Sequence, residues 1–221
     1  MSFEPNHGQT DPRVRFLARG KGYILFLTST EAVLALGETP RRALRMKLLG
    51  THRAPAAAGR GLLPGKSHYF LGNDPARWRS DVPAYERVEY KDVYPGVDLL
   101  FYGSEGELEY DFVVAPGSDP SRIAMGFSGV RKVRIDAAGN LVLMTRRGEV
   151  IQRKPAVYQV LGGTRRGVAG RYVLRGRRRV GFEVARYDTR RPLVIDPVLS
   201  YSTYLGGSGA DAGHAIAVEV P

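Results

Sequence analysis

The clearest pattern of apolar and polar positions lies in residues 90–120, where two apolar runs flank a short polar turn. In the second run, Leu108, Tyr110 and Phe112 alternate with acidic residues, which is the period-two pattern of a half-buried strand. The first run, 98–102, is apolar on both faces and is typical of a strand inside a sheet. The pattern therefore predicts a β-hairpin at the centre of the fold.

Short β-rich runs separated by turns continue on both sides of this hairpin. The predicted strands are 14–18, 23–28, 32–36 and 43–49 before it, and 123–127, 130–136, 141–145, 150–153, 156–161, 172–174, 180–184 and 192–195 after it. A helix at 30–36 is an alternative that its shortness disfavours. Two segments without periodicity are expected to be irregular, namely a lead-in at 3–12 and an exposed loop at 52–64.

This arrangement predicts an all-β fold with little or no helix, built as an antiparallel β-sandwich or two packed β-sheets from many short strands. The 27 glycines and 14 prolines suit many turns, and 43% hydrophobic residues allow a sizeable core. We expect one β-rich module over 1–198, with 116–122 as the point where it would divide into two subdomains. No apolar run is long enough for a membrane span, and a chain without cysteine has neither disulfides nor thiolate metal ligands.

The charge is concentrated in one part of the chain. The formal net charge is +11, from 33 basic and 22 acidic residues. Between Arg146 and Arg191 alone there are 14 basic and 3 acidic residues, a surplus that equals the net charge of the whole chain. Such a basic span indicates either an anionic partner or a solvated surface that serves solubility.

Motifs that would indicate catalysis are incomplete. Gly65-Lys66-Ser67 ends like a phosphate-binding loop, but Arg60 stands where that motif needs its first glycine. Ser128 and Ser208 lie in glycine-containing turns that do not match the nucleophile elbow G-x-S-x-G. The four histidines are His7, His52, His68 and His214. They lack the spacing of metal ligands, so no metal or cofactor is predicted.

The central acidic residues allow three interpretations: a solvated strand face, a calcium site, or a carboxylate pair for glycoside hydrolysis. A solvated face is the simplest of the three interpretations. The acidic residues are Asp92, Asp98, Glu107, Glu109, Asp111 and Asp119. The aromatic residues nearby suit either core packing or a ligand-stacking platform, and core packing is the simpler one. These are Tyr69, Phe70, Trp78, Tyr85, Tyr90 and Tyr94.

Four phrases carry a family resemblance: FEPNHGQTDPRVRFLARGKGY, LPGKSHYFLGNDPARW, YPGVDLLFYGSEGELEYDFVVAPGSDP and RPLVIDPVLSYSTYLGGSGADAGHAIAVE. With them the chain resembles the N-terminal module of bacterial proteins carrying SBBP, the seven-bladed β-propeller repeat. The resemblance implies an extracellular or cell-surface β-rich domain of unknown function, followed by a C-terminal β-propeller. It places an incomplete first repeat at 199–221, so the chain is expected to pack poorly from about residue 206. The N-terminus MSFEPNHGQT shows no signal-peptide pattern, so the expected location depends on the resemblance alone.

Two functions are compatible with these observations. The first is a non-catalytic structural, adhesive or binding module, and the alternative is a polysaccharide-active enzyme that uses Asp98, Glu107, Glu109 or Asp111. For the first, we predict a basic face that binds anionic surface polysaccharide or another polyanion. Its residues are Arg171, Arg175, Arg177, Arg178, Arg179 and Arg186, with Tyr172, Leu174, Phe182 and Val184 packed inward.

Overall fold

The computed structural model describes residues 1–20, 22–36, 43–51, 55–70, 72–104, 107–146 and 148–201. In these residues the chain forms a 19-stranded antiparallel sheet with two short 3₁₀ helices and no α-helix. The predicted all-β class with many short antiparallel strands is therefore confirmed. No helix in this described part of the chain is long and apolar enough to cross a membrane.

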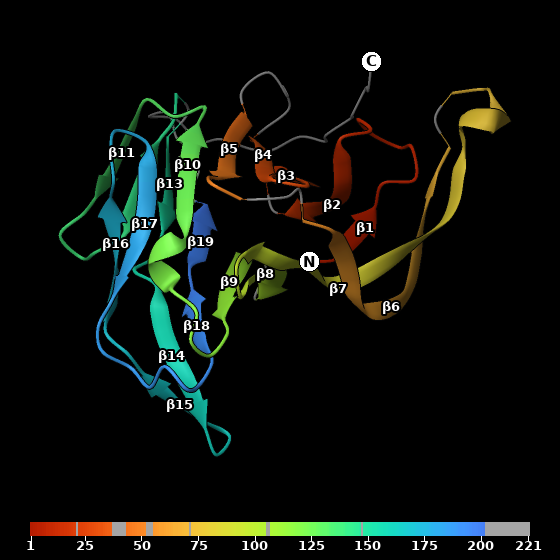
Figure 1. Cartoon of the computed structure of the whole chain (residues 1–221). Helices are drawn as coiled ribbons and strands as arrows, with labels where there is room; N and C mark the ends of the chain where they lie inside the picture. Colours follow the sequence, from red (N-terminus) through yellow and green to blue (C-terminus); the bar gives the residue numbers. More distant parts are fainter. Residues whose placement is uncertain are drawn as a thin grey trace, which may run out of the picture.

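The first nine strands form a curved sheet (Figure 1). They are β1 (Phe3–Pro5), β2 (Val14–Gly20), β3 (Tyr23–Thr28), β4 (Glu31–Leu36), β5 (Ala43–Leu48), β6 (Ala57–Tyr69), β7 (Arg79–Tyr94), β8 (Val97–Ser104) and β9 (Glu107–Val114). Hydrogen-bonded neighbours follow the order β5-β4-β3-β2-β1-β7-β8-β9, and β6 pairs with β7. The strands predicted before the central hairpin are thereby confirmed as an antiparallel meander.

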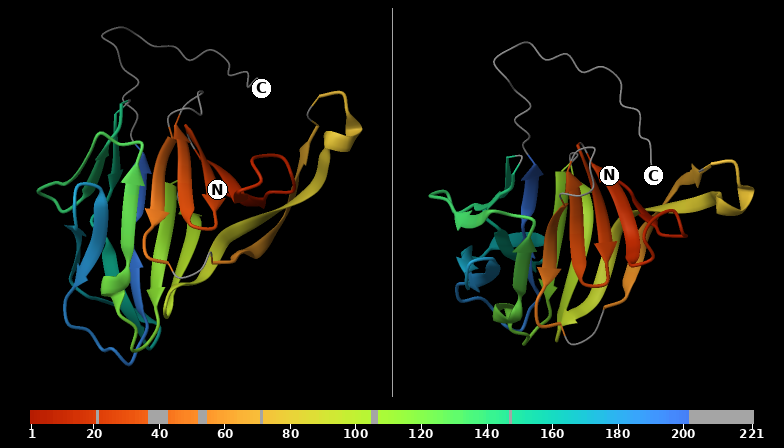
Figure 2. Two further views of the ribbon diagram at one scale, coloured as in Figure 1. Left: turned by 45° about the horizontal axis from the view of Figure 1, so that its top comes forward. Right: turned by 90° about the horizontal axis from the view of Figure 1, so that it is seen from above.

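The remaining strands extend both ends of that sheet. They are β10 (Ala124–Ser128), β11 (Lys132–Ile135), β12 (Leu141–Met144), β13 (Glu149–Gln152), β14 (Ala156–Leu161), β15 (Thr164–Gly167), β16 (Gly170–Leu174), β17 (Arg179–Val184), β18 (Leu193–Asp196) and β19 (Val198–Tyr201). At one end β5 pairs with β10, which continues to β17 and β16. At the other end β9 pairs with β18 and β19, which continue to β14–β15 and to β13–β12–β11. The two extensions approach each other, so the sheet is nearly closed (Figure 2).

Both halves of the chain contribute to one apolar core. Leu108, Tyr110 and Phe112 are almost fully buried in it, which confirms the predicted face of β9. The ring of Phe112 contacts those of Tyr110 and Phe182, at centroid distances of 5.9 and 5.8 Å. Strands from before and after 116–122 therefore share one core. β19 continues the sheet past residue 198, and the tail from 206 lies outside the described residues.

β6 and β7 form a long hairpin, here called the arm. From Arg87 onward β7 pairs with β8 inside the sheet, and the far part of the hairpin reaches away from it (Figures 1 and 2). The exposed loop predicted at 52–64 is wrong from residue 57 onward, because β6 begins there. Its periodicity is missing because β6 is exposed or half-buried along its whole length, so no apolar face is required. The irregular lead-in at 3–12 is wrong at Phe3–Pro5, which forms β1 and buries Phe3 completely.

The aromatic residues between 69 and 94 occupy two environments. Tyr90 and Tyr94 are buried, and Tyr85 packs against the core. Phe70 and Trp78 lie at the tip of the arm, 61% and 39% exposed, with ring centroids 5.2 Å apart. Core packing therefore explains only the aromatic residues close to the central hairpin.

Polar contacts hold the arm to β1. Glu4 is only 7% exposed. It accepts hydrogen bonds from Ser67 at 2.7 Å, from the Tyr69 hydroxyl, and from Arg19 at 3.3 Å. These donors replace the water that a buried carboxylate loses, which allows Glu4 to connect the arm with the sheet.

Candidate functional site

The first candidate site is the predicted basic face, here called the arginine surface. It lies on β16, on the turn between β16 and β17, at the start of β17 and just beyond its end. All six side chains are exposed: Arg171, Arg175, Arg177, Arg178, Arg179 and Arg186. The sequence pattern succeeds here because a β-strand alternates faces, so Tyr172 and Phe182 are buried while the arginines face solvent.

One residue of this pattern departs from the prediction. Leu174 was expected to pack inward, but it is 44% exposed. The reason is its position at the end of β16, which pairs only with β17 among the described strands and therefore has no further strand to cover it. Val184 is half-buried.

Few carboxylates neutralise the arginine surface. Arg171 forms an ion pair with Glu183, with N and O 2.7 Å apart. Arg175 donates a hydrogen bond to the carbonyl oxygen of Ser121. Among the described residues, the other members have no carboxylate oxygen within 4 Å. Most of the positive charge of this surface is therefore available to an external anion.

The central carboxylates, which the sequence left open between solvation and chemistry, fall into two groups. Asp98 pairs with Lys91 at 2.7 Å, and Glu107 pairs with Arg153 at 3.4 Å. Glu109 and Asp111 have no ion pair with any described residue. The solvated, neutralised face therefore accounts for only half of the four candidate carboxylates.

Tertiary structure adds a carboxylate that sequence reasoning missed. The register of β9 against β18 places Ile195 opposite Phe112. The next residues on the two strands, Asp196 and Asp111, therefore lie opposite each other on the other face of the sheet. We call Glu109, Asp111 and Asp196 the carboxyl cluster.

The carboxyl cluster is poorly solvated. Asp196 is 8% exposed, and its Oδ1 is buried without a hydrogen-bond partner among the described residues. Asp111 accepts a hydrogen bond from the Tyr102 hydroxyl at 3.0 Å. Burial, followed by the charge of Asp196, raises the pKa of Asp111 to about 7. Burial and the charge of Glu109 also raise the pKa of Asp196.

A groove of about 510 Å³ opens beside Asp111. Leu100 and Tyr102 of β8, Leu63 of the arm and Arg165 of β15 line it together with Asp111. The guanidinium of Arg165 lies over the ring of Tyr158, 4.3 Å from the ring centroid. Glu86 and Arg87 of β7 also line it. The groove therefore has one aromatic residue, Tyr102, and charged side chains of both signs, and Asp111 is the member of the carboxyl cluster that lines it.

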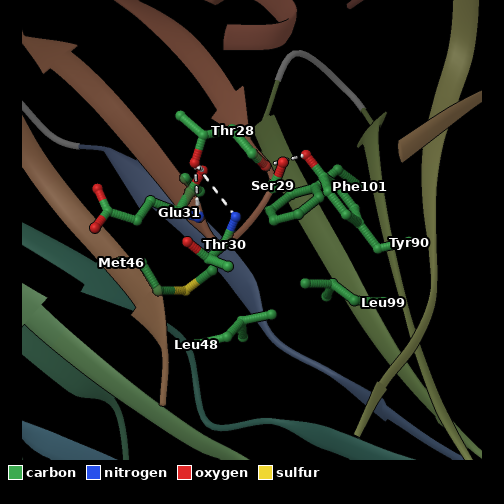
Figure 3. Close-up of a pocket in the computed structure, with 10 residues that line it drawn as sticks. Thr28, Ser29, Thr30, Glu31, Met46, Leu48, Tyr90, Leu99 and Phe101 are labelled. Carbon is green, nitrogen blue, oxygen red and sulfur yellow. Dashed lines mark hydrogen bonds between the residues drawn. The ribbon is translucent and has the colours of Figure 1, made fainter. Parts of the chain in front are cut away.

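A second, much smaller cavity lies under the turn between β3 and β4 and is shown in Figure 3. There Thr28 Oγ1 accepts hydrogen bonds from the backbone N–H groups of Thr30 and Glu31, and the Tyr90 hydroxyl donates to the Thr28 carbonyl. At about 10 Å³ the cavity holds at most one water molecule. It is a packing defect stabilised by a turn, not a ligand site.

Metal ligands do not converge in the residues that the structure describes. Within those ranges, no group of three or more His, Asp or Glu side chains is placed to hold a metal ion. His7 and His68 lie apart on the loop after β1 and on the arm, and His52 and His214 lie outside the described residues. The calcium interpretation of the central acidic stretch therefore gains no support from the geometry.

Comparison with known proteins places the chain in a family without assigning it an activity. Residues 3–198 match the family model of a domain of unknown function, DUF7948, and the chain belongs to this family. No curated protein and no solved structure matches the chain.

Proposed function

We propose that this domain is a non-catalytic binding module of a secreted or cell-surface protein that carries a C-terminal β-propeller of SBBP repeats. In this proposal the arginine surface binds anionic polysaccharide of the cell surface or another extended polyanion. The propeller and the location come from the sequence resemblance, and the binding mode comes from the arginine surface.

The observation that carries the proposal is the unneutralised charge of the arginine surface. In the N-terminal half, by contrast, several exposed basic residues pair with nearby carboxylates, as Arg13 does with Asp11 and Arg60 with Glu89. Arginine suits an extended polyanion because its planar fork matches sulfate, carboxylate and phosphate groups, and several arginines act together along one polymer.

The test is retention on a sulfated-polysaccharide column with elution by salt. We compare the parent with the variant Arg177→Ser, Arg178→Ser, Arg179→Ser. Each exposed ionic contact contributes roughly 0.5 kcal/mol, so loss of three should weaken binding about tenfold and move elution to lower salt.

A control variant separates the arginine surface from net charge. Arg13→Ser, Arg60→Ser, Lys66→Ser removes the same charge from exposed residues that are already ion-paired. We expect this control to elute close to the parent. Equal shifts of both variants would show that overall charge governs retention, and flow-through of the parent at low salt would refute the proposal.

The alternative function is a polysaccharide-active enzyme, and one observation favours it. Asp111, which the strand register sets opposite Asp196, lines a groove together with Tyr102, and glycoside hydrolysis uses a pair of carboxyl groups. The measurement is release of reducing ends from the polysaccharide that the column retains. Release that Asp111→Asn abolishes would support the enzyme.

A further inference from the structure

We propose that the arginine surface contains a subsite for one acidic sugar residue, in which Arg175 binds the acidic group. This inference rests on the proposed function and specifies the ligand of the same surface. The subsite is an open groove of about 540 Å³. It is lined by residues of β16 and β17, of the loop after β17, and of the 3₁₀ helix η2 (Pro120–Arg122), which lies beside β17 (Figure 1). Its volume is within the range of small-ligand sites, roughly 300 to 1,000 Å³.

A glycine fixes the position of Arg175. The Arg175 side chain lies across β17 at Gly181, and its Nη1 donates a hydrogen bond to the Ser121 carbonyl at 2.7 Å. A Cβ on Gly181 would lie only 2.8 Å from Nε and 2.9 Å from Cζ of Arg175, so a side chain there would displace the guanidinium. The φ of Gly181 is outside the left-handed range, so its backbone does not itself require glycine. The missing side chain of Gly181 therefore serves to seat Arg175.

The seated guanidinium keeps donors for a ligand. An arginine side chain has five N–H donors, and the Ser121 carbonyl accepts from one nitrogen of Arg175. Arg175 is exposed, and no carboxylate oxygen of the described residues lies within 4 Å of its nitrogen atoms. Its planar fork matches a carboxylate or sulfate group. Because the side chain is already held in place, binding an anion costs it little conformational entropy.

Two carboxylates line the same groove and limit it to one anionic group. Glu183 pairs with Arg171 at 2.7 Å, and Asp119 accepts hydrogen bonds from the Ser121 backbone N–H and hydroxyl, both at 2.8 Å. These hydrogen bonds, and less strongly the charge of Arg175, lower the pKa of Asp119, so it is ionised at neutral pH. Ionised Asp119 repels a ligand with closely spaced charges, whereas its remaining lone pairs accept hydrogen bonds from sugar hydroxyls.

The other walls of the groove suit a sugar ring. Tyr187 lines the groove beside Val173 and Val184, and all three are half-buried. Ser118 and Thr189 add hydroxyl groups. An aromatic ring packs against the apolar C–H face of a sugar, and hydroxyl groups bind those of the sugar. The combination therefore favours an acidic sugar residue over an inorganic anion.

The experiment is isothermal titration at physiological salt with a hyaluronan tetrasaccharide, in which acidic and uncharged sugars alternate. Chitotetraose, which is uncharged, and linear tetraphosphate, which contains no sugar, are the comparison ligands. We expect saturable binding of the tetrasaccharide by the parent and at least tenfold weaker binding of chitotetraose. Absence of tetrasaccharide binding, or equal binding of chitotetraose, would overturn the assignment.

Variants that conserve charge locate the subsite. Gly181→Ala displaces the guanidinium of Arg175 and should weaken tetrasaccharide binding about tenfold, while tetraphosphate binding should not change. Arg175→Lys keeps the charge but loses the planar fork, and should weaken tetrasaccharide binding to a similar extent. Gly167→Ala on β15 is the matched control, because a Cβ there meets no atom within 4 Å, and it should bind like the parent.

Thermal unfolding checks that Gly181→Ala remains folded. If it does not fold, Arg175→Lys carries the test, because that side chain is exposed. Parent-like tetrasaccharide binding by folded Gly181→Ala or by Arg175→Lys would refute the subsite.

The sulfated-polysaccharide column separates this inference from the proposed function. Gly181→Ala should elute like the parent, because its charge is unchanged. Retention that only the triple arginine variant weakens, with no effect of Gly181→Ala on tetrasaccharide binding, would support the arginine surface and refute the subsite. A parent that flows through the column but binds the tetrasaccharide through Gly181 and Arg175 would refute the extended surface and support the subsite.

Discussion

The central hairpin β8–β9 and the arm β6–β7 are both long antiparallel hairpins, but their surroundings differ. β8 and β9 have hydrogen-bonded neighbours on both sides and contribute buried residues to the core. β6 pairs only with β7, and it is exposed or half-buried throughout. The comparison shows that strand structure alone does not determine stability, because an isolated two-stranded ribbon is marginal in water.

Two features adapt the arm to its exposed position. Pro64 and Pro83 interrupt the hydrogen-bonding edges, which discourages pairing with other strands. Glu4 attaches the arm through polar contacts, where the central hairpin uses apolar burial. β7 is itself held in the sheet by its pairing with β8 and by buried residues such as Val88 and Tyr90, so only β6 and the far end of the arm depend on few groups.

The largest difference should appear on truncation of one aromatic side chain in each hairpin. Phe112→Ala should lower the free energy of unfolding by roughly 3 to 5 kcal/mol, because Phe112 is completely buried and leaves a cavity. Phe70→Ala, at the exposed tip, should change it by less than about 0.5 kcal/mol. Urea unfolding followed by circular dichroism measures both free energies. Equal losses in the two variants would contradict the proposed difference between the two hairpins.

A smaller effect should follow from releasing the arm. Glu4→Ala leaves Arg19 and Tyr69 without their shared acceptor and should cost about 1 to 3 kcal/mol. Trp78 is the only tryptophan, so its fluorescence reports on the arm tip separately from the circular dichroism of the whole sheet. We expect the Trp78 transition to move to lower urea than the dichroism transition. Coincident transitions would show that arm and sheet unfold as one unit.

The smallest effect concerns the carboxyl of the central hairpin. The pKa of Asp111 is raised from 3.8 to about 7, so the folded protein binds a proton that the unfolded chain has already released. The stability that this proton contributes is fully present below about pH 4 and is lost as pH rises through 7. Relative to Asp111→Asn, the parent should lose on the order of 1 kcal/mol between pH 5 and pH 8, since Asp111 is half-buried and partly screened.

A matched carboxylate on the arm provides the control. Asp81 is exposed and paired with Lys66 at 3.0 Å, and its φ of 58° is one that asparagine also tolerates. The hydrogen bond from Lys66 lowers the pKa of Asp81, so Asp81→Asn should leave the change in stability between pH 5 and pH 8 unchanged. A parent protein that gains stability from pH 5 to pH 8 relative to Asp111→Asn would contradict the sign of the Asp111 effect.

Local sequence pattern was sufficient to predict the elements that have one buried face. The alternation at Leu108, Tyr110 and Phe112 identified the inward face of β9, and the same alternation identified buried Tyr172 and Phe182. It failed at the arm, because β6 has no buried face and consequently no period-two signal. It failed again at Leu174, where burial depends on whether another strand lies beyond the end of β16.

The two candidate sites also differ in whether local sequence pattern predicts them. The sequence by itself determined the all-β class, the inward face of β9 and the concentration of positive charge between Arg146 and Arg191, because each depends on residues close together in the chain. Only the tertiary structure brought Asp196 opposite Asp111, since their pairing depends on the register of two strands about 80 residues apart. In the sequence, Asp196 preceded a proline and indicated only the end of a strand; its burial without a hydrogen-bond donor is a property of the folded sheet.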